Sequence, residues 1–124
     1  MLNNILNQIF DGGHNLEISN FQRLMKERYG KEDKERGAYF LFVVLSAELG
    51  ELADALKKEK SKNIGEELAD ILFCCAALAN YFDIDLEKVL VSKYVNQGSE
   101  QISRKWGEPV EAWKGKKSWG NIFG

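Results

Sequence analysis

Two pairs of acidic residues are the feature of this 124-residue sequence best suited to chemistry. Glu48 and Glu51 are three residues apart, and so are Glu67 and Asp70. Three residues on an α-helix leave side chains about 60° apart, so each pair would occupy one helix face. The sequence beside both pairs is strongly apolar. We therefore expect these carboxylates to be at least partly buried.

Buried carboxylates need a compensating charge, because removing even one from water without a partner costs several kcal/mol or more. Carboxylates that converge from two helices form an all-oxygen site, which suits Mg²⁺ or Mn²⁺ better than zinc. The chain has one histidine, His14, and its two cysteines are adjacent, so it offers no zinc ligand set. The spacing therefore predicts a divalent-cation site made by Glu48, Glu51, Glu67 and Asp70.

A simpler interpretation of the same acids stays open. Glutamates three residues apart on a helix are common and mostly solvated, so either pair alone is weak evidence. Asp54 lies one near-turn beyond Glu51 and fits a further ligand and a surface residue about equally well. The repetition of the spacing in the two most apolar segments favours the metal site.

The elements that must position these acids are helices. The only proline is Pro109, so nothing in residues 1–108 breaks a long helix in that way. Helical periodicity and end signals predict helices at about 19–29, 36–59, 61–82, 86–97 and 99–106. The second and third would pack antiparallel across a short turn and bring the two acidic pairs face to face.

Particular residues set the expected ends and the core. Ser19 should cap the first helix, Gly30 should end it, and Asp85 should cap the fourth. The middle of the helix at 36–59 is apolar on nearly all sides, which predicts that it is central to the core.

Composition indicates one ordinary globular domain, with 44% hydrophobic and 29% charged residues. We expect an all-α protein, an antiparallel bundle of four to five helices over residues 1–106, followed by an irregular tryptophan-containing tail over 107–124. The formal net charge of −2 gives no basic field for nucleic acid. No apolar stretch is long enough for a membrane span, and the sequence shows no signal peptide. Adjacent cysteines argue against a disulfide framework, and a cytoplasmic location is expected.

A family resemblance is carried by residues 46–94, SAELGELADALKKEKSKNIGEELADILFCCAALANYFDIDLEKVLVSKY. This run resembles the MazG-type all-α nucleotide pyrophosphohydrolases. That family has an E-x-x-E pair on one helix and an E-x-x-D pair on the next, where this chain has Glu48, Glu51, Glu67 and Asp70. The segment NFQRLMKERYG resembles the family's first helix, and the likeness covers about residues 16–95.

The resemblance implies a specific reaction. Such enzymes hydrolyse nucleoside triphosphates between the α and β phosphates, with Mg²⁺ as cofactor and Mn²⁺ as a substitute, to nucleoside monophosphate and pyrophosphate. It implies the same four acids as metal ligands, with Glu48 or Glu51 as the general base. Two alternatives remain: a phosphoribosyl-ATP pyrophosphohydrolase, and a non-catalytic helical interaction module whose carboxylates form intersubunit salt bridges.

The resemblance also suggests substrate-binding residues. Lys93 and Asn96 match in type a lysine and an asparagine that hold phosphate and nucleotide in the family, although the family's spacing is one residue longer and would select Gln97. Lys93 fits a solvated helix lysine equally well. Phe21 is a candidate for holding the base, but its place in an apolar helical stripe is more typical of a core residue.

Self-association is the last expectation from the sequence. The stretch from Ile71 to Ala79 has few polar side chains, and four short helices can hardly cover it. We therefore expect a homo-oligomer, a dimer or a tetramer, in which a second chain borders the nucleotide site.

Overall fold

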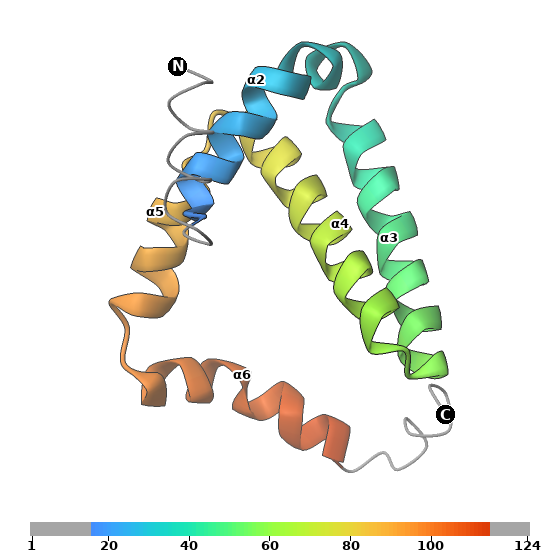
Figure 1. Ribbon diagram of the computed structural model, residues 1–124. Helices are drawn as coiled ribbons and strands as arrows, with labels where there is room; N and C mark the ends of the chain where they lie inside the picture. Colours follow the sequence, from blue (N-terminus) through green and yellow to red (C-terminus); the bar gives the residue numbers. More distant parts are fainter. Residues whose placement is uncertain (1–15, 115–124) are drawn as a thin grey trace.

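The structure is a computed structural model that describes the backbone of residues 16–114 and the side chains of residues 16–106. Its elements are α2 (Ile18–Arg36), α3 (Ala38–Lys58), α4 (Ser61–Tyr81), α5 (Leu86–Leu90), the π-helical turn η1 (Val91–Val95) and α6 (Ser99–Lys114) (Figure 1). The described residues contain no strand. The predicted all-α fold is confirmed.

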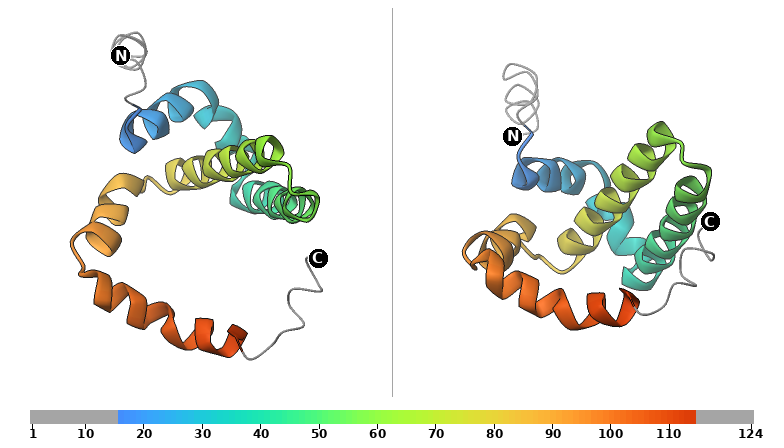
Figure 2. Two further views of the ribbon diagram at one scale, coloured as in Figure 1. Left: turned by 60° about the horizontal axis from the view of Figure 1, so that its bottom comes forward. Right: turned by 90° about the horizontal axis from the view of Figure 1, so that it is seen from below.

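The helix α4 lies at the centre of the described fold. It packs antiparallel against α3 along its length and against α2 on another face (Figures 1 and 2). Leu24 and Met25 of α2 meet Ala76 of α4 in the buried cluster, and Phe21 and Phe73 pack against it. The acids on α3 and α4 are thus held in the most extensive helix–helix contact among the described residues.

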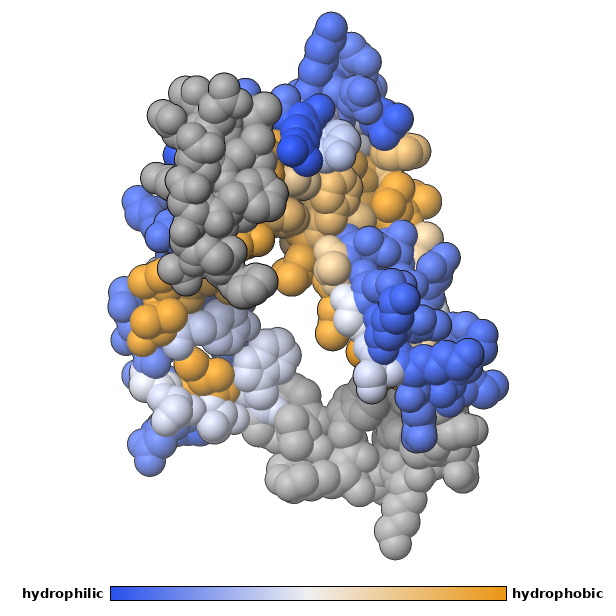
Figure 3. All heavy atoms as spheres, in the orientation of Figure 1, coloured by the Kyte–Doolittle hydropathy of each residue, from blue (hydrophilic) through white to orange (hydrophobic). Residues whose placement is uncertain are grey.

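The expectation that α3 is central to the core is wrong for the single chain. Only Leu41 and Ala55 of α3 are buried. Tyr39, Phe42 and Val43 remain 89%, 58% and 63% exposed, and Figure 3 shows this apolar surface at the N-terminal half of α3. The physical reason is that α2 packs mainly on α4, so the outer face of α3 has no partner within the described residues.

The ends of α2 also differ from expectation. The helix continues through Gly30, because an interior glycine costs only about 0.5–1 kcal/mol and tertiary packing can offset that. It ends at Gly37, whose φ of 92° and ψ of 163° are open to glycine and strained for other residues. The residue before the helix is Glu17, without a side-chain cap, so the predicted Ser19 cap is wrong.

The turn between α3 and α4 is very short. Glu59 adopts a left-handed conformation with φ of 53°, and its N–H donates to the Leu56 carbonyl at 3.2 Å. Lys60 follows, and α4 begins at Ser61. This two-residue connection sets the antiparallel register of the helices that carry the acids.

A polar clasp, made by Gln22 and Asn80, joins α2 to the start of α5. The Gln22 amide accepts from the Leu86 N–H at 3.0 Å, and donates to the Ile84 carbonyl and to Asn80 Oδ1. Asn80, which is buried, donates in turn to the Gln22 carbonyl at 2.9 Å. The clasp thereby sets the direction in which α5 leaves α4.

The α5 helix begins as its sequence predicts. The Asp85 side chain accepts from the Lys88 N–H at 3.1 Å, which confirms the predicted cap. After Leu90 the backbone loosens into η1, where the Asn96 N–H donates to the Val91 carbonyl at 2.9 Å. This five-residue hydrogen-bond spacing marks a π-helix, a form that is rare and often found at functional sites.

The last helix, α6, runs from Ser99 to Lys114, so the helix continues eight residues past the expected end at Trp106. Pro109 therefore lies inside this helix. A proline there removes one backbone hydrogen-bond donor but need not end the helix. The rest of the expected tail, 115–124, lies outside the described residues. The α6 helix lies apart from α3 and α4, across an opening that the space-filling view retains (Figures 2 and 3). None of the described helices is both long and apolar enough to span a membrane.

Candidate metal centre

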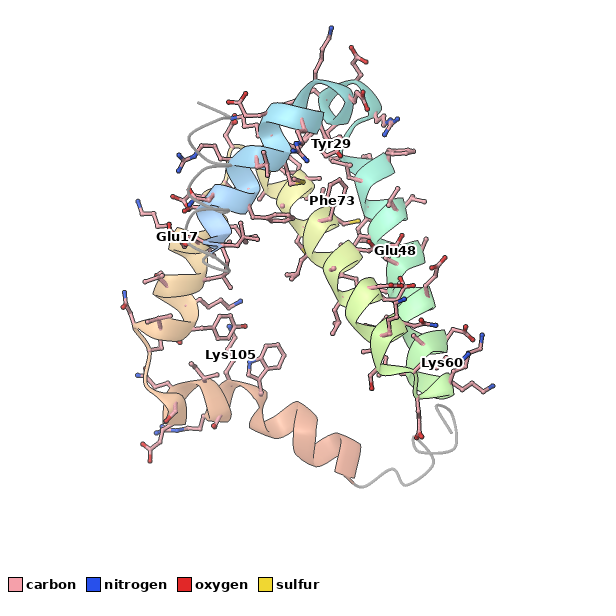
Figure 4. All side chains as sticks on the ribbon, in the orientation of Figure 1. Glu17, Tyr29, Glu48, Lys60, Phe73 and Lys105 are labelled. Carbon is pink, nitrogen blue, oxygen red and sulfur yellow. The ribbon has the colours of Figure 1, made fainter. Side chains whose placement is uncertain are left out.

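The three-acid cluster, Glu48, Glu67 and Asp70, lies where α3 faces α4. One carboxylate oxygen from each of the three residues lies within 4.8 Å of the others. The antiparallel hairpin explains this, because Glu48 and Asp70 lie at nearly equal distances along the chain from the turn. Figure 4 shows Glu48 on the side of α3 that faces α4. The predicted convergence of acids from two helices is present in the structure.

Burial and hydrogen bonding separate the members of this cluster. Glu48 and Glu67 are half-buried, whereas Asp70 is exposed. The Oε2 atoms of Glu48 and Glu67 are both buried, and neither has a hydrogen-bond partner among the described residues. Buried carboxylate oxygens without a donor are costly, and a bound divalent cation would satisfy both. The donor set therefore fits a hard cation.

The electrostatics of Glu67 reflect this crowding. Its pKa is raised from 4.5 to about 7, chiefly by sharing a hydrogen bond with Glu48, then by burial and by the charges of Glu51 and Glu48. Three carboxylates so close together repel one another, so Glu67 retains a proton at near-neutral pH. A cation in the cluster would replace that proton.

Glu51 is near this cluster but not part of its tightest set. It is exposed, and with Glu67 it lines a cavity of about 360 Å³ beside the hairpin. Its charge still contributes to the raised pKa of Glu67. Glu51 is thus placed to serve an ion or a water molecule held between the helices, rather than to pack among the buried carboxylate oxygens.

Asp54 takes the surface role. Its Oδ2 atom lies 2.8 Å from Lys58 Nζ, four residues later on the same helix. The hydrogen bond to Lys58 lowers the pKa of Asp54 and raises that of Lys58. Lys58 and Asn63 also line the 360 Å³ cavity beside Glu51 and Glu67. The sequence analysis did not select either residue as part of the site. The one available signal for Asn63 was its position four residues before Glu67.

The residues expected to bind substrate are not gathered around the acids in the single chain. Lys93 lies on η1 and Asn96 directly follows it, on the far side of α4 from α3 (Figures 1 and 2). Phe21 is half-buried against Leu24, Met25 and Ala76, as its core interpretation requires. Phe21 also lines an apolar cavity of about 380 Å³ between α2, α4 and α5.

Cys74 lies one turn along α4 from Asp70. It is buried and unpaired, and burial, followed by the charge of Glu48, raises the pKa of its thiol. A raised pKa leaves the sulfur protonated and poorly nucleophilic. This agrees with the interpretation of Cys74 as a small apolar core residue.

Comparison with known protein families gives one match: residues 40–97 match the family model of the MazG nucleotide pyrophosphohydrolase domain. Residues 40–97 are thus similar to a MazG domain. The match covers nearly all of α3, all of α4, α5 and η1, and all four acids predicted to bind metal. Comparisons with curated proteins and with solved structures gave no match. The match thus supports a nucleotide pyrophosphohydrolase activity in general.

Proposed function

We propose that this MazG protein hydrolyses nucleoside triphosphates between the α and β phosphates. A water molecule attacks the α-phosphorus, the bond to the bridging oxygen breaks, and pyrophosphate leaves. The products are a nucleoside monophosphate and pyrophosphate. The observation that carries this proposal is the three-acid cluster within the MazG domain, where two buried carboxylate oxygens have no hydrogen-bond partner among the described residues.

We assign the metal site to Glu48, Glu67 and Asp70, with Glu51 completing it from the adjoining cavity. Bound Mg²⁺, or Mn²⁺ in its place, would offset the charge of acids and phosphates and make a nearby water more acidic. The general base is Glu48 or Glu51. Glu51 is exposed and remains accessible to water, which favours it as the acceptor of the proton.

We propose that Lys93 and Asn96 bind phosphate and nucleotide, and that Phe21 borders the base. Phe21 lines the apolar cavity beside α5, which could receive a flat ring. Lys93 is exposed on η1, so its ammonium group is free to meet an anion. These positions are apart from the acids within one chain.

Self-association would supply the missing enclosure of the site. The sequence attributed this expectation to the stretch Ile71–Ala79 of α4, where Cys74, Ala76, Ala77 and Ala79 are buried but Leu72 is 63% exposed. The α3 helix adds a further exposed apolar surface, with Tyr39, Phe42 and Val43 on the outer face of the hairpin. We propose that a second copy covers that face in a dimer or tetramer.

A panel of triphosphates tests the activity directly. Common, deoxy and damaged nucleoside triphosphates and phosphoribosyl-ATP are incubated with the protein and Mg²⁺ or Mn²⁺, and pyrophosphate and phosphate are measured separately. We expect pyrophosphate and a nucleoside monophosphate from at least one triphosphate, and none after chelation of the metal.

Other outcomes contradict the proposal in distinct ways. Cleavage of phosphoribosyl-ATP alone would favour the histidine-pathway type of pyrophosphohydrolase, and release of inorganic phosphate would indicate a different bond. No product from any member at high protein concentration would favour a non-catalytic module. In that module, Glu67→Gln and Asp70→Asn would destabilise the protein to the same extent with and without Mg²⁺.

A further inference from the structure

An apolar groove of about 380 Å³ lies between α2, α4 and α5. Ile18 of α2 is 44% exposed there and Leu72 of α4 is 63% exposed. Glu17, which Figure 4 labels, also lines the groove at the start of α2. The apolar side chains that line it are those of Leu16, Ile18, Phe21, Ala69, Leu72, Ala76, Leu86 and Leu90. Large apolar side chains that stay exposed together favour a partner that covers them.

The described part of the chain begins at this groove. Leu16, its first residue, lines the groove and is 50% exposed. Fifteen residues precede Leu16 in the sequence. The last five of them, 11–15, can span about 17 Å when extended, and two glycines among them permit the chain to reverse its direction. Residues 2–10 are therefore within reach of the groove of their own chain.

The sequence of residues 2–10 has the pattern of an amphipathic helix. Its apolar residues are spaced three and four apart, which places them on one helix face. They are Leu2, Ile5, Leu6, Ile9 and Phe10. The opposite face holds asparagine and glutamine without Lys or Arg, which does not suit an anionic membrane surface. Because so short a helix is marginal in water by itself, it needs a surface on which to pack.

We propose that residues 2–10 dock with their apolar face in this groove of their own chain. A short tether raises the effective concentration of the segment at the groove to the order of mM, so docking within one chain is favoured over docking from another molecule. The match to the MazG family model begins at residue 40, so it assigns no role to this segment.

Docking of this segment has a consequence for the nucleotide. Phe21 lines the groove and is also the residue that we propose to border the base. The docked segment and the base therefore compete for one apolar surface, and the segment leaves the groove when a base enters. This consequence rests on the proposed function, whereas the docking itself does not.

A double-mutant cycle on the full chain in EDTA tests the docking. Ile9→Asn and Leu72→Asn should each lower the melting temperature by at least about 3 °C, because each removes apolar surface from the same contact. The double variant should melt little below the less stable single variant, since residues that share one contact are not additive. Additive shifts, or no shift from Ile9→Asn, would overturn the proposal.

Two further variants are the controls for this cycle. Leu56 is 47% exposed on α3 and does not line the groove, so the shift from Leu56→Asn should add to that from Ile9→Asn. Gln8→Asn, on the polar face of the segment, should leave the melting temperature unchanged. If Leu72→Asn does not fold, Leu90→Asn on α5 takes its place in the cycle.

Dilution distinguishes docking within one chain from docking between two copies. The loss of melting temperature caused by Ile9→Asn should be the same over a hundredfold range of protein concentration. A loss that disappears on dilution would mean that the segment of a second copy fills the groove, and it would overturn the assignment to the same chain.

Hydrolysis assays then test the competition with the base. Ile9→Asn should lower the KM for the nucleotide, because a larger fraction of the chains would have an open groove. An unchanged or higher KM would overturn the competition. If no triphosphate is hydrolysed, the proposed activity fails while the double-mutant cycle still decides whether the segment docks.

Discussion

Glu67 is the residue whose protonation should link pH, metal and stability. The pKa of Glu67 is about 7 in the folded chain, against 4.5 for a glutamate in the unfolded chain. The folded form therefore binds more protons than the unfolded form between these two pH values. Stability from this group is complete below about pH 4.5 and is lost as pH rises through about 7. Without metal, the melting temperature should therefore fall over that range.

Calorimetry or circular dichroism in EDTA checks this pH dependence. Glu67→Gln should flatten most of it, and the remainder would come from Asp33, whose pKa burial also raises. Adding Mg²⁺ to the unmodified protein should reverse the trend, because the ion competes with the proton. A melting temperature that holds steady with pH in EDTA would contradict the prediction.

Metal binding gives a second prediction for single residues. Glu48→Gln and Asp70→Asn should each weaken Mg²⁺ affinity by at least about tenfold, since even indirect partners of a metal typically matter that much. Mg²⁺ at 100 times its Kd stabilises a protein by about 2.7 kcal/mol, and the variants should lose most of that gain. Thermal melts at several Mg²⁺ concentrations measure it.

Glu66→Gln is the control for metal binding. Glu66 is exposed next to Glu67 on α4 but is absent from the three-acid cluster. It should keep the full response to Mg²⁺. An equal loss of response in this variant would mean that general acidity, and not the cluster, attracts the ion.

Sequence spacing predicts the meeting of Glu48, Glu67 and Asp70 because helix periodicity and a short turn are local properties. It does not predict that Glu51 stays exposed, since exposure depends on how the two helices rotate about their axes.

At the level of elements, Gly30 inside α2 and Gly37 directly after it should respond in opposite ways to alanine. Gly37→Ala should destabilise the protein by about 1–3 kcal/mol, because its φ of 92° and ψ of 163° are nearly exclusive to glycine. Gly30→Ala should stabilise it by about 0.5–1 kcal/mol, since Gly30 lies inside the helix and the added Cβ would be 3.4 Å from Lys26 Cγ, an ordinary contact. Urea unfolding distinguishes the two signs.

The clasp between α2 and α5 offers another prediction. Gln22→Ala would leave the Leu86 N–H and the Ile84 carbonyl without their partner, at a cost of about 1–3 kcal/mol. Hydrogen exchange of the α5 amides should accelerate. Gln101→Ala, on the exposed surface of α6, should leave both measurements unchanged.

The ends of the helices show which structural features local sequence signals predict and which they do not. The ends of α3 and α4 follow the sequence closely, because their apolar periodicity is long and the turn is sharp. The predicted stop at Gly30 is wrong, since a glycine ends a helix only where the backbone turns to positive φ, and that happens at Gly37. The placement of α3 at the centre of the core is wrong, because an apolar helix sequence does not tell which of its faces is packed within the same chain.

For the whole molecule, the exposed outer face of α3 leads to a prediction about assembly. Phe42→Lys and Val43→Lys place charges in this apolar surface and should shift an oligomer toward monomer by at least about tenfold in dissociation constant. Sedimentation velocity measures the shift. Glu27→Lys, on the exposed surface of α2, should not alter it. A monomer at micromolar concentration before any substitution would contradict self-association.

The two-residue turn between α3 and α4 has a consequence for the order of folding. Helices joined so closely need little loop closure, and contacts near in sequence form early and fast. We therefore expect the carboxylates of Glu48 and Glu67 to come into contact before α5 and α6 pack against the rest of the chain. Their mutual repulsion should be felt in the folding transition state, where it slows folding more than it speeds unfolding. Mg²⁺ would then act on the refolding rate of the chain as well as on its final stability.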